Sequence, residues 1–178
     1  IDLSGSMSGK PMNMARNAAM DFVSKINLNI HCVGIMGFAD RSKMFSNLTH
    51  EIASIESAIN KLDCNASRVG YGNDNNPLGD AIDIFKYKED SKNILIVLTD
   101  GVWSSQKQAI KSSDYCREVG YEVVAIGFGS ADKKFLERIS TNSENALMTN
   151  LDNLVDSFGS IAQEISQSGG ASGLKWNK

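Results

Sequence analysis

The chain has 178 residues, of which 42% are hydrophobic and 22% charged, so it is long enough for one globular domain with its own core. Its formal net charge is −3 and its pI is near 5.4, which argues against a nucleic-acid-binding face. No apolar stretch is long enough to span a bilayer, so we expect no membrane insertion.

The three cysteines, Cys32, Cys64 and Cys116, are scattered along the chain. Their number is odd, and no two have the close spacing of a metal or redox pair. Scattered thiols fit a reducing compartment better than a disulfide framework, so a cytoplasmic location is expected.

The first third of the chain alternates between strand and helix patterns. Ile1 is interpreted as the last residue of a strand whose beginning is missing. A helix is predicted over 10–26, with apolar residues on one face and a proline near its start. A strand is predicted over 30–38, a short antiparallel edge strand over 42–48, and a helix over 52–62.

The apolar run Ile94-Leu-Ile-Val-Leu98 predicts a strand that is covered on both faces and is therefore central in a sheet. The segment 64–77 is rich in Asn, Gly and Asp and is predicted to be a loop. Helices are expected at 78–86, 107–119, 132–139 and 151–167, and further strands at 122–128 and 146–148.

This alternation predicts an α/β fold with a mostly parallel central sheet, one antiparallel edge strand and helices on both faces. We expect the domain to cover residues 1–167. The Gly/Ser-rich residues 168–178 are expected to form a flexible tail or linker.

Two predicted strand ends carry oxygen-bearing side chains: Asp2-Leu-Ser-Gly-Ser6 and Thr99-Asp100-Gly101. Ligands of open parallel sheets collect at the carboxyl ends of strands, so the two segments can converge. In an extended turn Asp2, Ser4 and Ser6 point the same way, and Gly5 allows a sharp turn between them. Carboxylates and hydroxyls are hard ligands, which favour Mg²⁺ or Mn²⁺ over zinc.

The segment Asp2-Leu-Ser-Gly-Ser6 resembles the D-x-S-x-S motif of von Willebrand factor A domains. Asn76-Pro-Leu-Gly-Asp-Ala81 resembles the family's third loop, T-P-L-G-x-A, and Ile96-Val-Leu-Thr-Asp100-Gly101 resembles its later strand end with an Asp. The resemblance extends from Ile1 to about Gln167, and the expected strand and helix order also matches. It implies a Rossmann-like fold that binds a partner protein through a metal-ion-dependent adhesion site.

The metal ligands that the resemblance implies are Asp2, Ser4, Ser6, Asn76 and Asp100. The ion would be Mg²⁺, or else Mn²⁺ or Ca²⁺, and a carboxylate of the partner would take its open position. The sequence departs from the family at Asn76, where the family has Thr. An Asn amide oxygen can ligate directly, act through a water, or leave the place to Asn75 or Asp74.

Two other functions compete with this interpretation. The same fold can serve as a metal-free interaction module with a degenerate site. A phosphoryl-handling enzyme is the second alternative, because Gly5-Ser-Met-Ser-Gly9-Lys10 resembles a phosphate-binding loop. That loop is one residue short between its glycines and is followed by Pro11, and Ser4 stands where an aspartyl phosphotransferase needs a second carboxylate. We therefore expect no enzyme.

Trp103 follows Asp100-Gly101 in a short loop at the predicted binding edge. Tryptophan is common among interface hot spots, so Trp103 is a candidate for contact with the partner. The alternative is that its ring lies against the domain's own surface. The serines near the motif have a plainer interpretation too, as caps of the following helix.

Overall fold

The computed structural model describes residues 1–85, 91–171 and 174. The helices are α1 (Lys10–Lys25), α2 (Ile52–Asn60), α3 (Ala66–Val69), α4 (Pro77–Phe85), α5 (Gln106–Glu118), α6 (Lys133–Ile139) and α7 (Leu154–Ser168). The strands are β1 (Val33–Phe38), β2 (Ser42–Thr49), β3 (Ile94–Thr99), β4 (Glu122–Gly127) and β5 (Ala146–Met148). Two 3₁₀ turns, η1 (Gly5–Met7) and η2 (Ser143–Asn145), complete the described elements.

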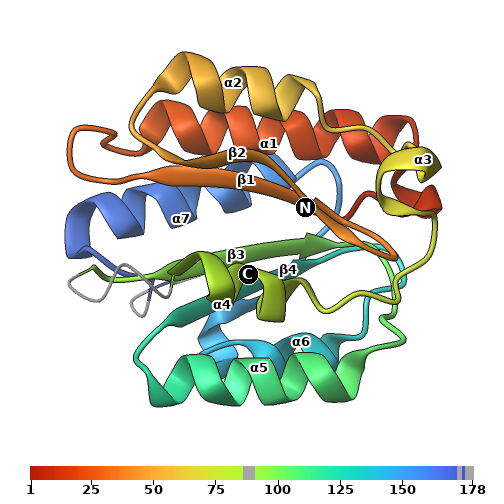
Figure 1. The fold of residues 1–178 in the computed structure, drawn as a ribbon. Helices are drawn as coiled ribbons and strands as arrows, with labels where there is room; N and C mark the ends of the chain where they lie inside the picture. Colours follow the sequence, from red (N-terminus) through yellow and green to blue (C-terminus); the bar gives the residue numbers. More distant parts are fainter. Residues whose placement is uncertain (86–90, 172–173, 175–178) are drawn as a thin grey trace.

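The described strands form two sheets that run alongside each other (Figure 1). β1 and β2 make an antiparallel pair, whereas β3, β4 and β5 are parallel in that order. The predicted α/β class, with one antiparallel strand and helices on both faces, is confirmed. The carboxyl ends of β1 and β3 lie beside the first residues of the chain, which places the predicted site at this edge.

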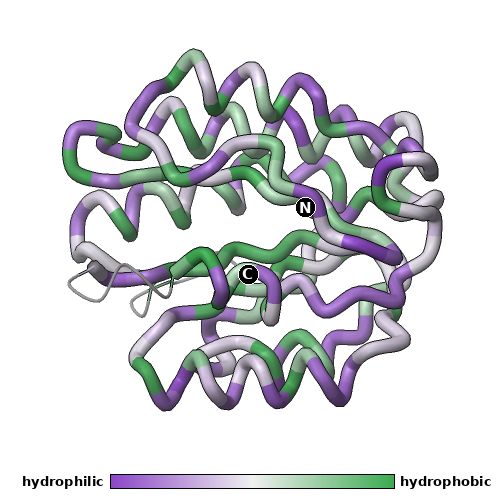
Figure 2. Tube along the Cα trace, in the orientation of Figure 1, coloured by the Kyte–Doolittle hydropathy of each residue, from purple (hydrophilic) through white to green (hydrophobic). Residues whose placement is uncertain are grey.

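Helices cover both faces of the strands, with α1 and α2 on one side and α5 and α6 on the other (Figure 1). Alternate residues of a strand face opposite sides, so β4 contributes Val124 and Ile126 to one core and Val123 and Ala125 to the other. Figure 2 shows the hydrophobic residues concentrated along β3. The fold therefore has three layers and two apolar cores.

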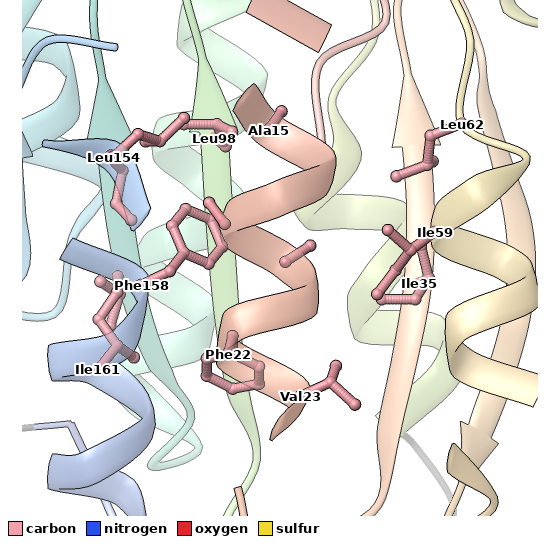
Figure 3. Packing of buried hydrophobic residues seen from close by; sticks show 14 of the residues in the cluster. Ala15, Phe22, Val23, Ile35, Ile59, Leu62, Leu98, Leu154, Phe158 and Ile161 are labelled. Atoms are coloured by element: carbon pink, nitrogen blue, oxygen red, sulfur yellow. The ribbon is translucent and has the colours of Figure 1, made fainter. Parts of the chain in front are cut away.

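The first core joins α1 and α7 to β3 and packs α2 against β1, as Figure 3 shows. The ring of Phe22 on α1 meets Phe158 on α7 edge-on, with centroids 6.4 Å apart. Burial of a large apolar side chain contributes roughly 1.5–3 kcal/mol. This packing holds α1, and with it the loop that precedes it, against β3.

Several boundaries differ from the sequence prediction for local reasons. β1 begins at Val33 and not at residue 30, because Asn27 closes a turn by accepting the N–H groups of Ile30 and His31. The expected loop at 64–77 contains the short helix α3, whose first turn Asn65 supports by accepting the Ser67 N–H. The expected helix 78–86 is observed as α4, Pro77–Phe85, and residue 86 lies outside the described residues, so its end is not tested.

The last described residues pack onto the domain. The backbone N–H of Ala171 donates to Glu122, and the Ala171 and Leu174 side chains are buried. The predicted boundary at residue 167 remains a prediction. None of the helices within the described ranges is long and apolar enough to cross a membrane.

Residues 1–3 lie extended between β1 and β3 and are hydrogen bonded to both strands. Asp2 N–H donates to the carbonyl of Leu98 at 2.9 Å, and Leu3 N–H donates to that of Phe38 at 2.7 Å. Phe38 N–H in turn donates to the carbonyl of Ile1 at 3.0 Å. Asp2 is therefore fixed by the backbones of two strands.

Candidate metal site

Four of the five predicted ligands meet at the carboxyl end of β3. The Ser6 hydroxyl donates to Asp100 Oδ1 at 2.7 Å, and the Ser4 and Ser6 hydroxyl oxygens are 3.1 Å apart. Asp2 Oδ1 accepts the backbone N–H of Ser4 at 2.8 Å, and Asp2 Oδ2 accepts the Thr99 hydroxyl at 2.5 Å. We call Asp2, Ser4, Ser6 and Asp100 the oxygen cluster.

The turn η1 brings the two serines together. The segment is a 3₁₀ turn and not the extended turn that the spacing suggested, yet both hydroxyls still lie on one side. The side chains of Leu3 and Met7 are fully buried and pack the turn against the first core. Gly9, at φ +81°, then reverses the backbone so that α1 can start at Lys10. The turn leaves Ser6 exposed, whereas Ser4 is buried at 2% exposure.

Both carboxylates of the oxygen cluster are removed from water. Asp2 is 0% exposed and Asp100 is 7% exposed. Within the described chain, no Lys or Arg side chain forms an ion pair with either of them. Burial raises the pKa of the Asp100 carboxyl above its usual value; the hydrogen bond from Ser6 opposes this rise, and the charge of Asp2 adds to it. The site therefore holds negative charge that only hydroxyl and backbone dipoles offset.

The same negative charge also shifts the pKa of the Cys64 thiol. Burial raises its pKa to about 11, and the charges of Asp2, Asp63 and Asp100 contribute to that rise while Arg16 opposes it. A cation beside Asp2 and Asp100 would relieve this field.

The third loop brings Asn73, which was not a predicted ligand, to Gly101, the residue after Asp100. Asn73 accepts the backbone N–H of Ser104 at 3.0 Å, and its amide lies against Gly101. A Cβ at Gly101 would lie only 2.9 Å from Asn73 Nδ2, so a larger residue there would displace the Asn73 amide. Asn73 Oδ1 is buried without a hydrogen-bond partner. It is an oxygen donor that the sequence analysis missed.

Asn76 lies differently from the sequence expectation. Its Nδ2 donates to Ser112 Oγ on α5 at 2.9 Å, and its Oδ1 accepts the Gly79 N–H at 3.4 Å. None of its side-chain hydrogen bonds goes to the oxygen cluster. Of the two alternatives, Asn75 donates to side chains of β2 and α4, whereas Asp74 is exposed. The assignment of Asn76 as a ligand stays a prediction.

Trp103 is a core residue, which corrects its proposed role as a partner contact. Its side chain is 2% exposed and meets Phe38 and Phe135 edge-on, with centroids 5.1 and 5.2 Å away. The indole is buried because its N–H finds a partner there: Nε1 donates to Thr99 Oγ1 at 3.0 Å. Thr99 donates onward to Asp2, so Trp103 helps to orient Asp2 from inside the core.

The donor set fits a hard divalent cation in its chemistry. The described residues contain no group of three or more His, Cys, Asp or Glu side chains that could hold a metal. The oxygen cluster is of another kind, because two carboxylates are joined by two hydroxyls and, nearby, an unpartnered amide oxygen. An all-oxygen set of this type suits Mg²⁺, Mn²⁺ or Ca²⁺.

Comparison with known proteins identifies the family of the chain and proteins that share its fold. The family model of the von Willebrand factor type A domain matches residues 1–164. A von Willebrand factor A domain-containing protein of Dictyostelium discoideum is 30% identical over 169 residues, which cover 83% of this chain and 18% of that protein. The chain thus spans less than a fifth of that relative's length.

Solved structures share the fold at low sequence identity. A von Willebrand factor type A protein from Catenulispora acidiphila has a TM-score of 0.76 at 16% identity, covering 92% of this chain and 40% of that one. Proximal thread matrix protein 1 of the mussel byssus, with zinc in its metal-ion-dependent adhesion site, has a TM-score of 0.77 at 24% identity, covering 91% and 43%. Manganese-loaded TRAP protein of Plasmodium vivax has a TM-score of 0.68 at 15% identity, covering 88% and 68%.

Proposed function

The chain belongs to the von Willebrand factor type A domain family, whose members are protein-interaction modules, and from this premise we propose that it binds a partner protein through a divalent cation. The observation that carries the proposal is the meeting of Asp2 and Asp100, both buried, with the hydroxyls of Ser4 and Ser6. Isolated buried carboxylates are costly, and a cation at this place offsets their charge.

Asp2, Ser4, Ser6 and Asp100 would hold the ion, with one further oxygen from the third loop. Asn73 is our candidate for that oxygen, because its amide group lies against Gly101 and its buried Oδ1 has no hydrogen-bond partner among the described residues. Asn76 remains the alternative that the family motif suggests. Mg²⁺ is the first candidate, followed by Mn²⁺ and Ca²⁺. The zinc and manganese in the two metal-bound relatives support a divalent ion in general and not one metal in particular.

The charge of the site favours an acidic partner group. Asp2 and Asp100 together carry −2, which a divalent cation cancels, and the hydroxyl and amide donors are neutral. A carboxylate of the partner can then approach the ion without net repulsion from the protein. At about 4 Å and an effective dielectric near 20, a unit charge pair is worth roughly 4 kcal/mol before desolvation. A third protein carboxylate in the site would remove this advantage.

A metal-free interaction module is the second candidate function. In that case Asp2 would be a structural residue whose carboxylate accepts the Ser4 N–H and the Thr99 hydroxyl. We also propose that the domain is not an enzyme. Lys10, which would face phosphates in a nucleotide-binding loop, instead lies 3.9 Å from Asp152 on the surface, with its side chain 71% exposed.

Binding to an immobilised domain with Mg²⁺ and then with EDTA tests the proposal. We expect the partner to be retained with Mg²⁺, released by EDTA and lost in Asp2→Asn. Glu118→Gln is the matched control, because Glu118 is exposed and lies at the opposite end of α5 from the site loop. A partner that stays bound equally in EDTA and in Asp2→Asn would favour the metal-free module.

A further inference from the structure

The antiparallel pair of β1 and β2 carries a thiol and an imidazole at the end that is remote from the oxygen cluster. Cys32 directly precedes β1, and His50 directly follows β2. Val33 pairs with Thr49 in the register of the two strands, so the next residues outward, 32 and 50, lie opposite each other. Residues that face each other in this way have Cβ atoms roughly 4.5–5.5 Å apart. The register of the sheet therefore brings Cys32 and His50 together.

The two side chains are hydrogen bonded, and the backbone orients the imidazole ring. Cys32 Sγ lies 3.0 Å from His50 Nε2, and His50 Nδ1 lies 2.7 Å from the carbonyl oxygen of Leu28. Leu28 belongs to the turn before β1, which is closed by hydrogen bonds to the carbonyl of Asn27. The turn thus places a fixed acceptor on the side of the ring that faces away from the thiol.

The Leu28 carbonyl determines which nitrogen of His50 carries the proton. A carbonyl oxygen can only accept, so Nδ1 is the donor in that contact. In the neutral ring Nε2 is then unprotonated, and it accepts the thiol proton of Cys32. A nucleophile beside a base that a third group orients is the arrangement that activates thiols in proteins. His50 can therefore take the proton of Cys32 and leave a thiolate next to an imidazolium.

Cys32 is also accessible, in contrast to the other two cysteines of the chain. Its side chain is exposed, whereas Cys64 is partly buried and Cys116 is buried. Burial raises the pKa of both Cys64 and Cys116 to about 11, so both remain protonated at neutral pH. Because the thiolate and not the thiol is the nucleophile, these two residues are internal controls for the reactivity of Cys32.

We propose that Cys32 is a modification site, at which His50 generates a thiolate that exchanges with small disulfides. The proposal does not rest on metal binding. The thiol lies at the amino end of β1, whereas Asp2 of the oxygen cluster pairs with Phe38 at the carboxyl end of the same strand.

The exchange needs no oxidant other than the disulfide itself. His50 Nε2 takes the proton of Cys32, and Sγ attacks one sulfur of the reagent R–S–S–R. The S–S bond of the reagent breaks while a new S–S bond forms between Cys32 and the attacked sulfur. The leaving thiolate R–S⁻ takes the proton from His50 and departs as R–SH. Cys32 is thereby oxidised to a mixed disulfide, and the other half of the reagent is reduced to a thiol.

Reaction of the folded chain with oxidised glutathione tests the proposal, with intact mass and peptide mapping as the measurements. At pH 7 we expect one glutathione per chain, on Cys32, with Cys64 and Cys116 unmodified. His50→Gln should slow the reaction at Cys32 by about tenfold or more, because an amide is not a base. Modification of Cys64 or Cys116 as fast as Cys32, or an unchanged rate in His50→Gln, would overturn the proposal.

The same reaction at pH 9.5 separates proton removal from access to the thiol. An exposed thiol with the ordinary pKa of about 8.5 ionises there without a base, so the unchanged protein and His50→Gln should react at nearly equal rates. His31→Gln is the matched control, because His31 adjoins Cys32 in the chain and its Nε2 has no hydrogen-bond partner among the described residues. It should react as the unchanged protein does at both pH values. A deficit of His50→Gln that persists at pH 9.5 would show that His50 affects access only, and would refute its role as the base.

Discussion

Trp103 and Thr99 show how a residue outside the oxygen cluster supports it. The indole N–H donates to the Thr99 hydroxyl, and that hydroxyl donates to Asp2 Oδ2. Asp2 therefore has one oxygen fixed by Thr99 and the other by the Ser4 N–H. These two hydrogen bonds hold both oxygens of the Asp2 carboxylate.

We expect Trp103→Ala to lower the free energy of unfolding by roughly 3–5 kcal/mol, because it empties a site between Phe38 and Phe135. Trp103→Phe keeps an aromatic ring and removes the N–H donor, so it should destabilise less. Urea denaturation of both variants measures this. If Trp103→Ala left stability unchanged, the ring would not be part of the core.

Substitution of Asn73 and of Asn76, which lie in the same loop, tests which of them supplies the third-loop oxygen. We expect Asn73→Ala to weaken Mn²⁺ affinity by about tenfold, because the Asn73 amide lies against Gly101, next to Asp100, and its buried Oδ1 has no partner among the described residues. Asn76→Ala should affect stability more than affinity, since its amide bonds to Ser112 and Gly79. Titration of the three proteins with Mn²⁺ decides between them. A reversed order would return the ligand role to Asn76.

The sequence alone predicts the carboxylates that follow strands more readily than the oxygen donor that the third loop contributes. Asp2 and Asp100 follow strands, and the carboxyl ends of parallel strands meet, so their convergence is predictable. Asn73 is not predictable in the same way, because its place depends on the path of a loop rich in Asn and Gly. Gly101 is the one signal in the sequence, since it marks a close approach of another segment.

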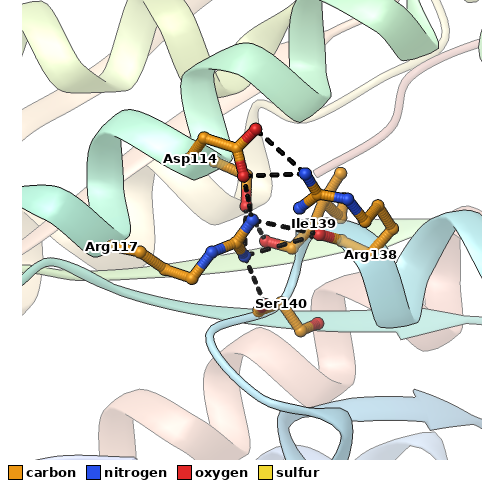
Figure 4. Close-up of polar contacts among 6 residues, drawn as sticks. Asp114, Arg117, Arg138, Ile139 and Ser140 are labelled. Carbon is orange, nitrogen blue, oxygen red and sulfur yellow. Dashed lines mark hydrogen bonds and ion pairs between the residues drawn. The ribbon is translucent and has the colours of Figure 1, made fainter.

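At the scale of elements, α5 and α6 are joined by a network of charges shown in Figure 4. Asp114 on α5 accepts from Arg117 Nη2 at 2.5 Å and from Arg138 Nη2 on α6 at 2.9 Å. Arg117 Nη1 also donates to the carbonyl of Ser140, which follows α6, at 2.8 Å. These contacts fix the end of α6 against α5.

The hydrogen bonds from Arg117 and Arg138 hold the pKa of Asp114 below its ordinary value of 3.8. A carboxyl with a lowered pKa stabilises the fold above its unfolded pKa and loses that contribution as the pH falls through its folded pKa. We expect Asp114→Asn to lower the Tm modestly at pH 7, because the pair is exposed and screened. The difference in Tm between the two proteins should shrink as the pH falls through the lowered pKa of Asp114. A difference that stayed the same as the pH falls would show that the charge of Asp114 is not responsible.

The spacing of hydrophobic residues predicts a helix well where its buried residues lie along one face. On α1, Ala15, Ala19 and Phe22 share the predicted face, and all three are buried. Prediction fails where a side chain competes with regular structure. The Asn27 side chain accepts the Asn29 N–H in a turn that precedes β1, and the Asn65 side chain supports a helix inside a predicted loop. Such hydrogen bonds are local, but they cannot be inferred from the spacing of hydrophobic residues.

At the scale of the whole molecule, the alternation of strands and helices is enough to predict the three-layer fold. The run from Ile94 to Leu98 predicts a strand covered on both faces, and the two cores on either side of β3 and β4 agree with that. The separation of the strands into two sheets is not visible in any local pattern, because it depends on how β1 and β3 lie on either side of residues 1–3.

The same convergence of distant segments produces the site. Asp2 is held by the backbones of β1 and β3, and Asp100 follows β3 directly, so the relative position of the two carboxylates depends on the packing of the whole domain. A change that loosens the contact of α1 with α7 should therefore disturb the site as well as the core.

Calorimetric titration of the domain with Mg²⁺ and Mn²⁺ tests the central claim most directly. We predict one ion per chain, with affinity reduced by about tenfold or more in Asp2→Asn and in Asp100→Asn, because each removes one of the two charges that face the cation. Glu118→Gln should bind as the unchanged protein does. Equal binding by all four proteins, or no binding up to millimolar metal by the folded domain, would contradict the account.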